Sequence, residues 1–436
     1  MKSALPLALV AFTGVAGCMP DTSGIDPPLD RLIYPTGLAM TKGDGHILVA
    51  NSDFDLEYNA GTLVAIDLGQ TFGPDGGVTS DGEVSGDGNE YYVHPKIDAE
   101  ESIRIGAFAS DLKLTPAKDR ALVPVRGERA IIVVDVDDTK NGDLLSCGED
   151  TERRCDAAHR VESNDQHTLP IEPYEVAALD FREPNGETTT LGFATHLAGG
   201  EISLFVLRDG SSRSRFKAEL IDVVGPVVPS ASGIAVNPEN NDIFVSGRAD
   251  PVSRVAVLRV LTDSQNGWYA RSPFFGQTNE ITVGADIYGG TDARGLAVAP
   301  SGKRAFVVLR SPAALAELDA ESYKFLDMTT VGAEPSIAAV YEESAPGSTP
   351  YVFVLCFLTD QVFIIDPDLM MVVAVRHVGR GPHAIAFDHT RRLAYVANFR
   401  ESTLSVIHAT EPFDHLRDAK GRVVKIGVPH LPKGHG

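Results

Sequence analysis

Apolar and polar residues alternate in short runs along most of the chain. Residues 381–409 show the pattern clearly: a Gly-Pro turn, a short apolar strand, a charged turn, a second strand and, after a polar turn, a third strand. The agreement between this unit and residues 34–68 indicates a repeat architecture, in which each repeat is one supersecondary unit. The two units share one spacing, since Pro382, Ile385 and Asn398 match Pro35, Leu38 and Asn51.

The same plan recurs seven times. Each repeat opens on a strand whose first aliphatic residue serves as a marker, and β-branched second and third strands follow. Fourth strands are visible in every repeat except the second, where the strand near His167–Ile171 is poorly defined. No stretch longer than about ten residues carries a helical period. The pattern predicts an all-β fold, a seven-bladed β-propeller with about four antiparallel strands per blade. The markers are Leu38, Leu112, Val176, Ile234, Leu296, Ile337 and Ile385.

Three motifs of these repeats resemble the YVTN-type propeller repeats of exported bacterial and archaeal proteins. They are the Gly-Pro before the first strand, the VAN that ends the second strand and the V-x-x-I-D style of the third. The resemblance covers residues 32–428 and is best in blades 1 and 7, whereas Pro124 interrupts it in the second strand of blade 2. It implies a propeller. The family includes cofactor-dependent dehydrogenase-like chains, lactonases and pure binding modules, so the fold does not determine the function.

The N-terminus is typical of an exported lipoprotein. Lys2 precedes an apolar run, Ala4–Ala16, that is too short to span a bilayer. Val15-Ala16-Gly17-Cys18 then resembles the lipobox of bacterial lipoproteins, which implies that Cys18 is acylated; an ordinary secretory signal with a chance cysteine is the alternative. The residue after Cys18 is Met rather than Asp, which favours an outer-membrane lipoprotein facing the periplasm or the cell surface, held by its lipid alone. We therefore assign residues 1–17 to a signal peptide, 18–31 to a flexible tether, 32–429 to the propeller and 430–436 to a tail.

Three further cysteines complete the set of four. Cys147 and Cys155 flank a short polar loop, which in an exported protein indicates a local disulfide. A metal-binding pair is the alternative, although no second Cys/His pair lies nearby. Cys356 lies in an apolar strand and is expected to be an inert buried thiol.

The formal net charge of −22 argues against a nucleic-acid partner, because phosphates require a basic face. Against this acidic background, arginine occurs at one repeat position, 14 residues after the marker, in blades 2, 4 and 5. Two more basic side chains lie two residues before their markers, and a histidine ends the second strand of blade 3. In a propeller these positions meet at the top mouth of the central channel, so they predict a site for an anionic small molecule. The candidate residues are Arg126, Arg248, Arg310, Arg294, His383 and His196.

Two alternatives to an anion site remain open. Each arginine could instead pair with an acid of a neighbouring blade, such as Asp111, Glu175 or an aspartate in a loop. The histidines and acids could form a metal site, but arginines in the same ring would repel a cation and the ligand spacing is absent. No nucleophile elbow, Walker motif or dinucleotide fingerprint is present. The sequence therefore predicts no catalytic residue, no metal and no cofactor.

Long insertions favour a second kind of surface. They occur at residues 69–102, 137–169 and 261–280, all in turns that a propeller places on its bottom face. Insertions on one face of a repeat protein often mark its binding face. Our leading hypothesis is a lipid-anchored binding or scaffolding module for a protein partner on this face. The alternative is small-molecule binding or an enzymatic site at the arginine-rich mouth. The aromatic residues of the blade 4 insertion could anchor the partner or cover the blade's own edge; they are Trp268, Tyr269, Phe274 and Phe275.

Overall fold

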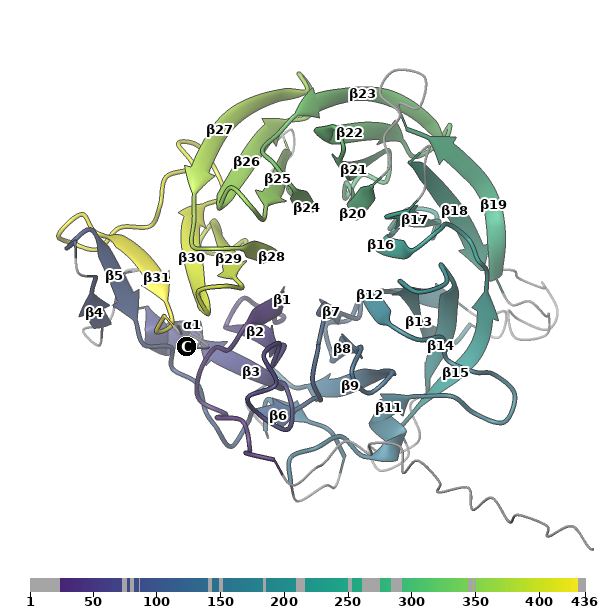
Figure 1. The fold of residues 1–436 in the computed structure, drawn as a ribbon, viewed down its shortest axis with the longest axis horizontal. Helices are drawn as coiled ribbons and strands as arrows, with labels where there is room; N and C mark the ends of the chain where they lie inside the picture. The colour runs from purple at the N-terminus through teal and green to yellow at the C-terminus, as the bar shows by residue number, and fades with distance from the viewer. Residues whose placement is uncertain are drawn as a thin grey trace, which may run out of the picture.

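The computed structural model of the chain describes residues 24–72, 77–78, 82–85, 87–139, 143–148, 152–182, 186–208, 216–249, 253–260, 275–283, 292–343, 348 and 350–429. Seven antiparallel sheets stand in a ring around a central axis, which confirms the seven-bladed β-propeller (Figure 1). Cys18 and most of the blade 4 insertion, with Trp268, Tyr269 and Phe274, lie outside the described residues, as does the side chain of Phe275.

Each blade is built outward from the axis in chain order. The innermost strands are β1 Pro35–Met40, β7 Lys113–Leu114, β12 Pro173–Arg182, β16 Ala231–Val236, β20 Ala293–Val298, β24 Pro335–Tyr341 and β28 Pro382–Asp388. The second strands are β2 His46–Asn51, β8 Arg120–Val125, β13 Thr188–His196, β17 Ile243–Gly247, β21 Arg304–Arg310, β25 Tyr351–Cys356 and β29 Leu393–Asn398. The third strands are β3 Thr62–Asp67, β9 Ala130–Val136, β14 Ile202–Arg208, β18 Arg254–Val260, β22 Ala313–Asp319, β26 Gln361–Asp366 and β30 Thr403–His408.

The outer edges are less regular than the inner strands. The fourth strands are β6 Ile103–Arg104, β15 Lys217–Val224, β19 Phe275–Thr282, β23 Lys324–Thr330, β27 Met371–His377 and β31 Val423–Ile426. Strand β19 begins inside the segment that the sequence assigns to the blade 4 insertion. In blade 2 the prediction of an outer strand near His167–Ile171 is wrong. Two short strands, β10 Leu145–Ser146 and β11 Arg160–Val161, pair with β9 instead, joined through the 3-10 turn η1 Ala157–His159.

The hydrophobic core consists of seven clusters, each between two adjacent blades. Because side chains alternate across a strand, a strand buried on both faces can serve two interfaces. In β2, Ile47 and Val49 pack toward blade 7, while Leu48 and Ala50 pack toward blade 2. All four side chains are fully buried. This explains why the second strands are continuous apolar runs.

The asparagine of the VAN motif closes the top of its blade. The side chain of Asn51 is buried, donates from Nδ2 to Thr62 Oγ1 at 2.8 Å and accepts from the Ile33 backbone N–H at 3.0 Å. Asn398 makes the equivalent bond to Thr403 Oγ1 at 2.9 Å. A buried amide with satisfied donors and acceptors fixes the loop against the third strand. The repeated asparagine is therefore structural.

The disulfide between Cys147 and Cys155 is present, as the sequence predicts. It joins residues eight apart in the chain, on the two segments that carry β10 and β11. A disulfide that closes a loop of this length stabilises the folded protein by roughly 2–3 kcal/mol, because it restricts the conformations of the unfolded chain. Cys356 is free and fully buried, and burial raises the pKa of its thiol to about 12, so it is unreactive.

The blade 1 insertion adds a feature that the sequence does not predict. After the short helix α1 Leu68–Thr71, strands β4 Gly82–Val84 and β5 Glu90–Val93 form a hairpin, and β5 pairs in parallel with β31 of blade 7. Figure 1 shows this hairpin outside blade 7, far from the rest of blade 1's sheet. Blade 7 has its four strands from consecutive sequence, as expected, but the ring is also held by this strand addition.

Candidate functional site

One backbone hydrogen bond recurs at the top of all seven blades. The residue that follows or ends the second strand donates its N–H to a carbonyl in the loop that leads into the first strand, at 2.9–3.2 Å. We call this residue the rim position. In blades 1, 2, 4, 5 and 7 this residue lies 14 residues after the marker, so the spacing found in the sequence corresponds to one place in the ring. The rim residues are Ser52, Arg126, Leu197, Arg248, Arg310, Phe357 and Phe399.

A second set of residues lies on the innermost strands. The first strands of blades 1 and 3–7 each shift register near their top end, in β1 between Pro35 and Gly37 and in β28 between Pro382 and Ala384. Such bulges re-aim side chains. In each shift we consider the residue two positions before the marker. In blade 6 the register shows that the equivalent marker is Ala338 rather than Ile337. The residues are Thr36, Tyr174, Ser232, Arg294, Ser336 and His383.

Rim and bulge residues of blades 3 to 7 surround one cavity of about 390 Å³. Four of the six sequence-predicted residues line it. Small-molecule sites commonly have this size and combine a few polar groups with aromatic walls. The side chains that characterise it are Arg248, Arg294, Arg310, His383, Tyr174 and Phe357.

Arg126 and His196 do not line this cavity. Arg126 holds the rim position of blade 2, but its Nη2 pairs with Glu172 Oε1 at 2.7 Å. His196 is the last residue of β13, one before the rim position, so strand alternation turns it into the blade. It is fully buried, with Nδ1 3.3 Å from the Ile171 carbonyl and Nε2 2.9 Å from Ser203 Oγ.

The arginines of the cavity differ in how far acids neutralise them. Arg294 makes a two-pronged pair with Asp292, its Nη2 lying 2.7 Å from Asp292 Oδ2. Arg310 Nη1 lies 3.5 Å from Glu334 Oε2, a longer contact. Asp292 and Glu334 both lie in the loops that lead into first strands. The alternative that the arginines pair with loop acids therefore holds in part for Arg294 and Arg310.

Arg248 has no acidic partner within ion-pair distance among the described residues. Its guanidinium carbon lies 4.2 Å from the centroid of the Tyr174 ring, a cation–π contact. Its buried Nε has no hydrogen-bond partner in the described part of the chain. Burial, which disfavours the charged form, lowers the pKa of Arg248. Arg248 is therefore the cation best placed to gain from an incoming anion.

Asp111 and Glu175, considered as arginine partners from the sequence, instead bind the backbone of the next blade. Asp111 Oδ2 accepts from the Val176 N–H at 3.2 Å. Glu175 Oε2 accepts from the Ile234 N–H, also at 3.2 Å. Burial and the neighbouring carboxylate of Asp111 raise the pKa of Glu175 to about 8, so Glu175 is predominantly neutral at pH 7.

His383 brings a neutral ring to the same cavity. Its Nδ1 donates to the Thr36 carbonyl at 3.1 Å, since a carbonyl can only accept. Burial lowers the pKa of His383, with the nearby arginines acting in the same direction. The neutral imidazole thus serves as a flat aromatic wall with one free acceptor nitrogen.

Aromatic side chains line one wall of the cavity and continue beyond it, and the prediction from the sequence did not include them. Phe357 and Phe399 occupy the rim position in blades 6 and 7, whereas blades 2, 4 and 5 carry arginine there. The centroid of the His383 ring lies 6.2 Å from that of Phe357 and 5.8 Å from that of Phe399. Phe399 lies 14 residues after its marker, so the same count that found the arginines could have found it.

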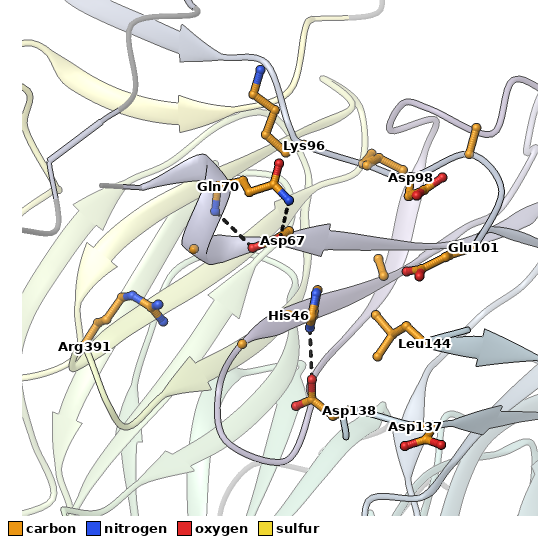
Figure 2. Close-up of a pocket in the computed structure, with 15 residues that line it drawn as sticks. His46, Asp67, Gln70, Lys96, Asp98, Glu101, Asp137, Asp138, Leu144 and Arg391 are labelled. Carbon is orange, nitrogen blue, oxygen red and sulfur yellow. Dashed lines mark hydrogen bonds and ion pairs between the residues drawn. The ribbon is translucent and has the colours of Figure 1, made fainter. Parts of the chain in front are cut away.

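Figure 2 shows a second cavity, of about 730 Å³, on the opposite face. The insertions of blades 1 and 2 contribute most of its lining. Acidic side chains outnumber basic ones there, and His46 Nδ1 lies 3.2 Å from Asp138 Oδ1 (Figure 2). This cavity does not suit an anion. Its acidic side chains are Asp67, Asp98, Glu101, Asp137 and Asp138.

The described residues contain no group of three or more His, Cys, Asp or Glu side chains arranged to hold a metal ion. No helix in the described part of the chain is long and apolar enough to cross a membrane.

Comparisons with known proteins identify no family for this chain. No protein-family model matches the chain, and no curated protein is similar to it in sequence. Among solved structures, a protein from Lactobacillus plantarum is similar over 80% of this chain and 86% of its own, with 12% identity and a TM-score of 0.49.

Proposed function

We propose that this propeller is a binding module that takes a small anionic ligand at the top mouth of its channel. One observation carries the proposal. Arg248, Arg294 and Arg310 line a single cavity, and Arg248 has no acidic partner within ion-pair distance among the described residues. A guanidinium buried in this way gains charge-assisted hydrogen bonds when a carboxylate or phosphate enters.

The rest of the charge distribution supports a selective site rather than a generally basic surface. The chain has 60 acidic residues against 38 lysines and arginines. Neutral Glu175 reduces the negative charge beside the arginines, because its raised pKa keeps it protonated at pH 7. The cavity therefore concentrates positive charge within an acidic protein, an arrangement that favours small anions over extended polyanions.

The cellular context that we propose is the bacterial envelope. Cys18 would carry the lipid anchor, and residues 18–31 would tether a YVTN-type propeller facing the periplasm or the cell surface. The Cys147–Cys155 disulfide is compatible with an oxidising, exported location. Metabolic labelling with a fatty acid tests the anchor: incorporation that Cys18→Ser abolishes supports it, and incorporation that persists contradicts it.

A protein partner on the bottom face is our second proposal. The cavity of Figure 2, built by the blade 1 and blade 2 insertions, is acidic and would suit a basic segment. A photo-crosslinker at Asp98 should yield a specific adduct in intact envelopes that the same group at Lys217, on the outer edge of blade 3, does not. Identical adducts from both positions would argue against this proposal.

A thermal-shift screen of the purified protein tests the anion site. The panel contains carboxylates, phosphates, neutral sugars and divalent metal ions. A ligand at 100 times its dissociation constant should stabilise the fold by about 2.7 kcal/mol. We expect stabilisation by an anion that Arg248→Gln removes and that Arg126→Gln, at the same repeat position but outside the cavity, retains. A screen with no anion-specific shift would overturn the proposal.

A further inference from the structure

Four consecutive rim positions carry two chemically different kinds of side chain. Blades 4 and 5 carry Arg248 and Arg310 there, whereas blades 6 and 7 carry Phe357 and Phe399. The shared backbone hydrogen bond means that these four side chains start from equivalent places around one axis. A cationic arc therefore continues directly into an aromatic arc.

The aromatic arc extends well beyond the cavity wall. Ring centroids of Phe399 and Phe357 lie 6.2 Å apart, those of Phe399 and Phe54 5.3 Å, and those of Phe54 and Phe108 6.1 Å. Tyr34 packs against Phe399 at 5.3 Å. These distances and tilted geometries are typical of favourable aromatic pairs. The arc runs from blade 6 through blades 7 and 1 to the loop before blade 2, and Phe54 is 55% exposed.

The two arcs meet at the cavity. Phe357 and His383 line it together with Arg248 and Arg310, and Tyr174 stands across from them beneath the Arg248 guanidinium. Half-exposed aromatic rings next to incompletely paired guanidinium groups offer stacking surface as well as charge-assisted donors. The guanidinium carbon of Arg400 lies 4.6 Å from the centroid of the Phe357 ring, so a ligand ring would contact the part of Phe357 that Arg400 leaves uncovered. A hydrated inorganic anion would use only the donors and would leave the rings exposed.

We propose that the ligand is an aromatic acid, in which a planar ring bears one carboxylate. The carboxylate lies between Arg248 and Arg310, and the ring lies against Phe357 and His383. This inference rests on the proposed anion site and specifies its ligand class.

Calorimetric titration with matched acids tests the ring preference. The probes are benzoate and 1-naphthoate, with cyclohexanecarboxylate and acetate as non-aromatic acids and benzamide as a neutral ring. Ring–ring contacts should favour benzoate over cyclohexanecarboxylate by about threefold to tenfold. Benzamide should not bind measurably, because it lacks the charge.

Variants separate the contribution of the ring from that of the charge. Phe357→Leu should weaken benzoate binding by a larger factor than acetate binding, and Phe399→Leu serves as a second variant if Phe357→Leu folds poorly. Phe325→Leu, on the outer strand β23, is the matched control and should change neither affinity. Arg248→Gln should weaken both acids by about tenfold or more.

The outcomes distinguish the two proposals. Equal affinity for benzoate and cyclohexanecarboxylate, both lost in Arg248→Gln, would overturn the aromatic-acid inference and leave the anion site standing. Absence of binding by every acid would overturn the anion site itself. A benzoate preference that both phenylalanine variants leave intact would also contradict the inference.

Discussion

The Arg248 guanidinium carbon lies 4.2 Å from the centroid of the Tyr174 ring, across the boundary between blades 4 and 3. Tyr174 stands at the bulge of the innermost strand β12, and Arg248 follows the second strand β17. The contact holds a positive charge at the channel mouth, with no carboxylate within ion-pair distance among the described residues. Charge held by a π face stays available to a ligand, whereas charge held by an acid does not.

Substitution of Tyr174 tests this relationship. Tyr174→Leu should lower the free energy of unfolding by about 1 kcal/mol through loss of the cation–π contact, and should weaken binding of benzoate because Arg248 loses its orientation. Tyr174→Phe keeps the ring and should retain most of both properties, losing only what the hydroxyl contributes through its interaction with Arg248. Urea titrations and calorimetry measure the two effects, and equal behaviour of the leucine and phenylalanine variants would contradict this account.

Anion binding should weaken at alkaline pH because of Glu175. The pKa of Glu175 is raised to about 8, so the side chain is neutral at pH 7 and gains a negative charge beside Arg248 as the pH rises through 8. Benzoate affinity should therefore fall between pH 7 and 9. Glu175→Gln, which cannot ionise, should remove most of that fall, and an unchanged pH profile in this variant would show that another group is responsible.

Acid should destabilise the fold through His196. The ring is buried and neutral, and burial lowers its pKa to about 4, while the unfolded chain takes up this proton near pH 6.5. The stability contribution is thus complete above pH 6.5 and is lost as the pH falls toward 4, by about 3 kcal/mol in total. His196→Gln should flatten the pH dependence of urea unfolding between pH 7 and 4.5.

His94 provides the control for this prediction, since its side chain is 44% exposed. His94→Gln should leave the pH dependence unchanged. If both variants kept the slope of the parent protein, the acid sensitivity would have a source other than His196.

The hairpin that joins blade 1 to blade 7 depends on Lys425. Its ammonium lies 2.9 Å from both Glu90 Oε1 and Glu401 Oε1, and its side chain is 7% exposed. Because removal of one partner leaves buried charge uncompensated, Lys425→Met should cost roughly 3–5 kcal/mol. Hydrogen exchange should become faster first at Tyr91–Val93, whose strand pairs with β31.

Lys217 offers the matched comparison, because its pair with Glu219 is exposed on both sides. Lys217→Met should change the free energy of unfolding by less than about 1 kcal/mol. If Lys425→Met were as mild as Lys217→Met, the buried pair would not secure the hairpin.

The fold could be predicted from the sequence because each repeat places the same kinds of residue at the same structural positions. Apolar alternation, a proline at the start of the first strand and an asparagine at the end of the second recur at a fixed distance from Leu38 and Ile385, and the hydrogen bond at the rim position recurs with them. The hairpin at β4 and β5 was missed since residues 82–93 are rich in Gly, Asp and Glu, and their pairing partner lies more than 300 residues away. The pattern of apolar and polar residues within one repeat contains no information on a contact between such distant segments.

The candidate site was predicted in part for the same reason. Counting from the marker located Arg248 and Arg310, but it could not show that Glu172 neutralises Arg126, because that pairing depends on where a loop of the next blade lies. His196 was expected at the channel mouth, but it lies one residue before the rim position, and the alternation of side chains along β13 turns it into the blade. Phe357 was hidden by the expanded turn of blade 6, which changes the count from its marker.

The position of a bound aromatic acid tests the central claim most directly. Crystals of the protein grown with 4-iodobenzoate would show the iodine by its anomalous scattering. We predict one site at the channel mouth, with the carboxylate on Arg248 and Arg310 and the ring against Phe357 and His383, and no site in crystals of Arg248→Gln. Iodine bound elsewhere with an empty mouth, or the same site retained in Arg248→Gln, would contradict the account.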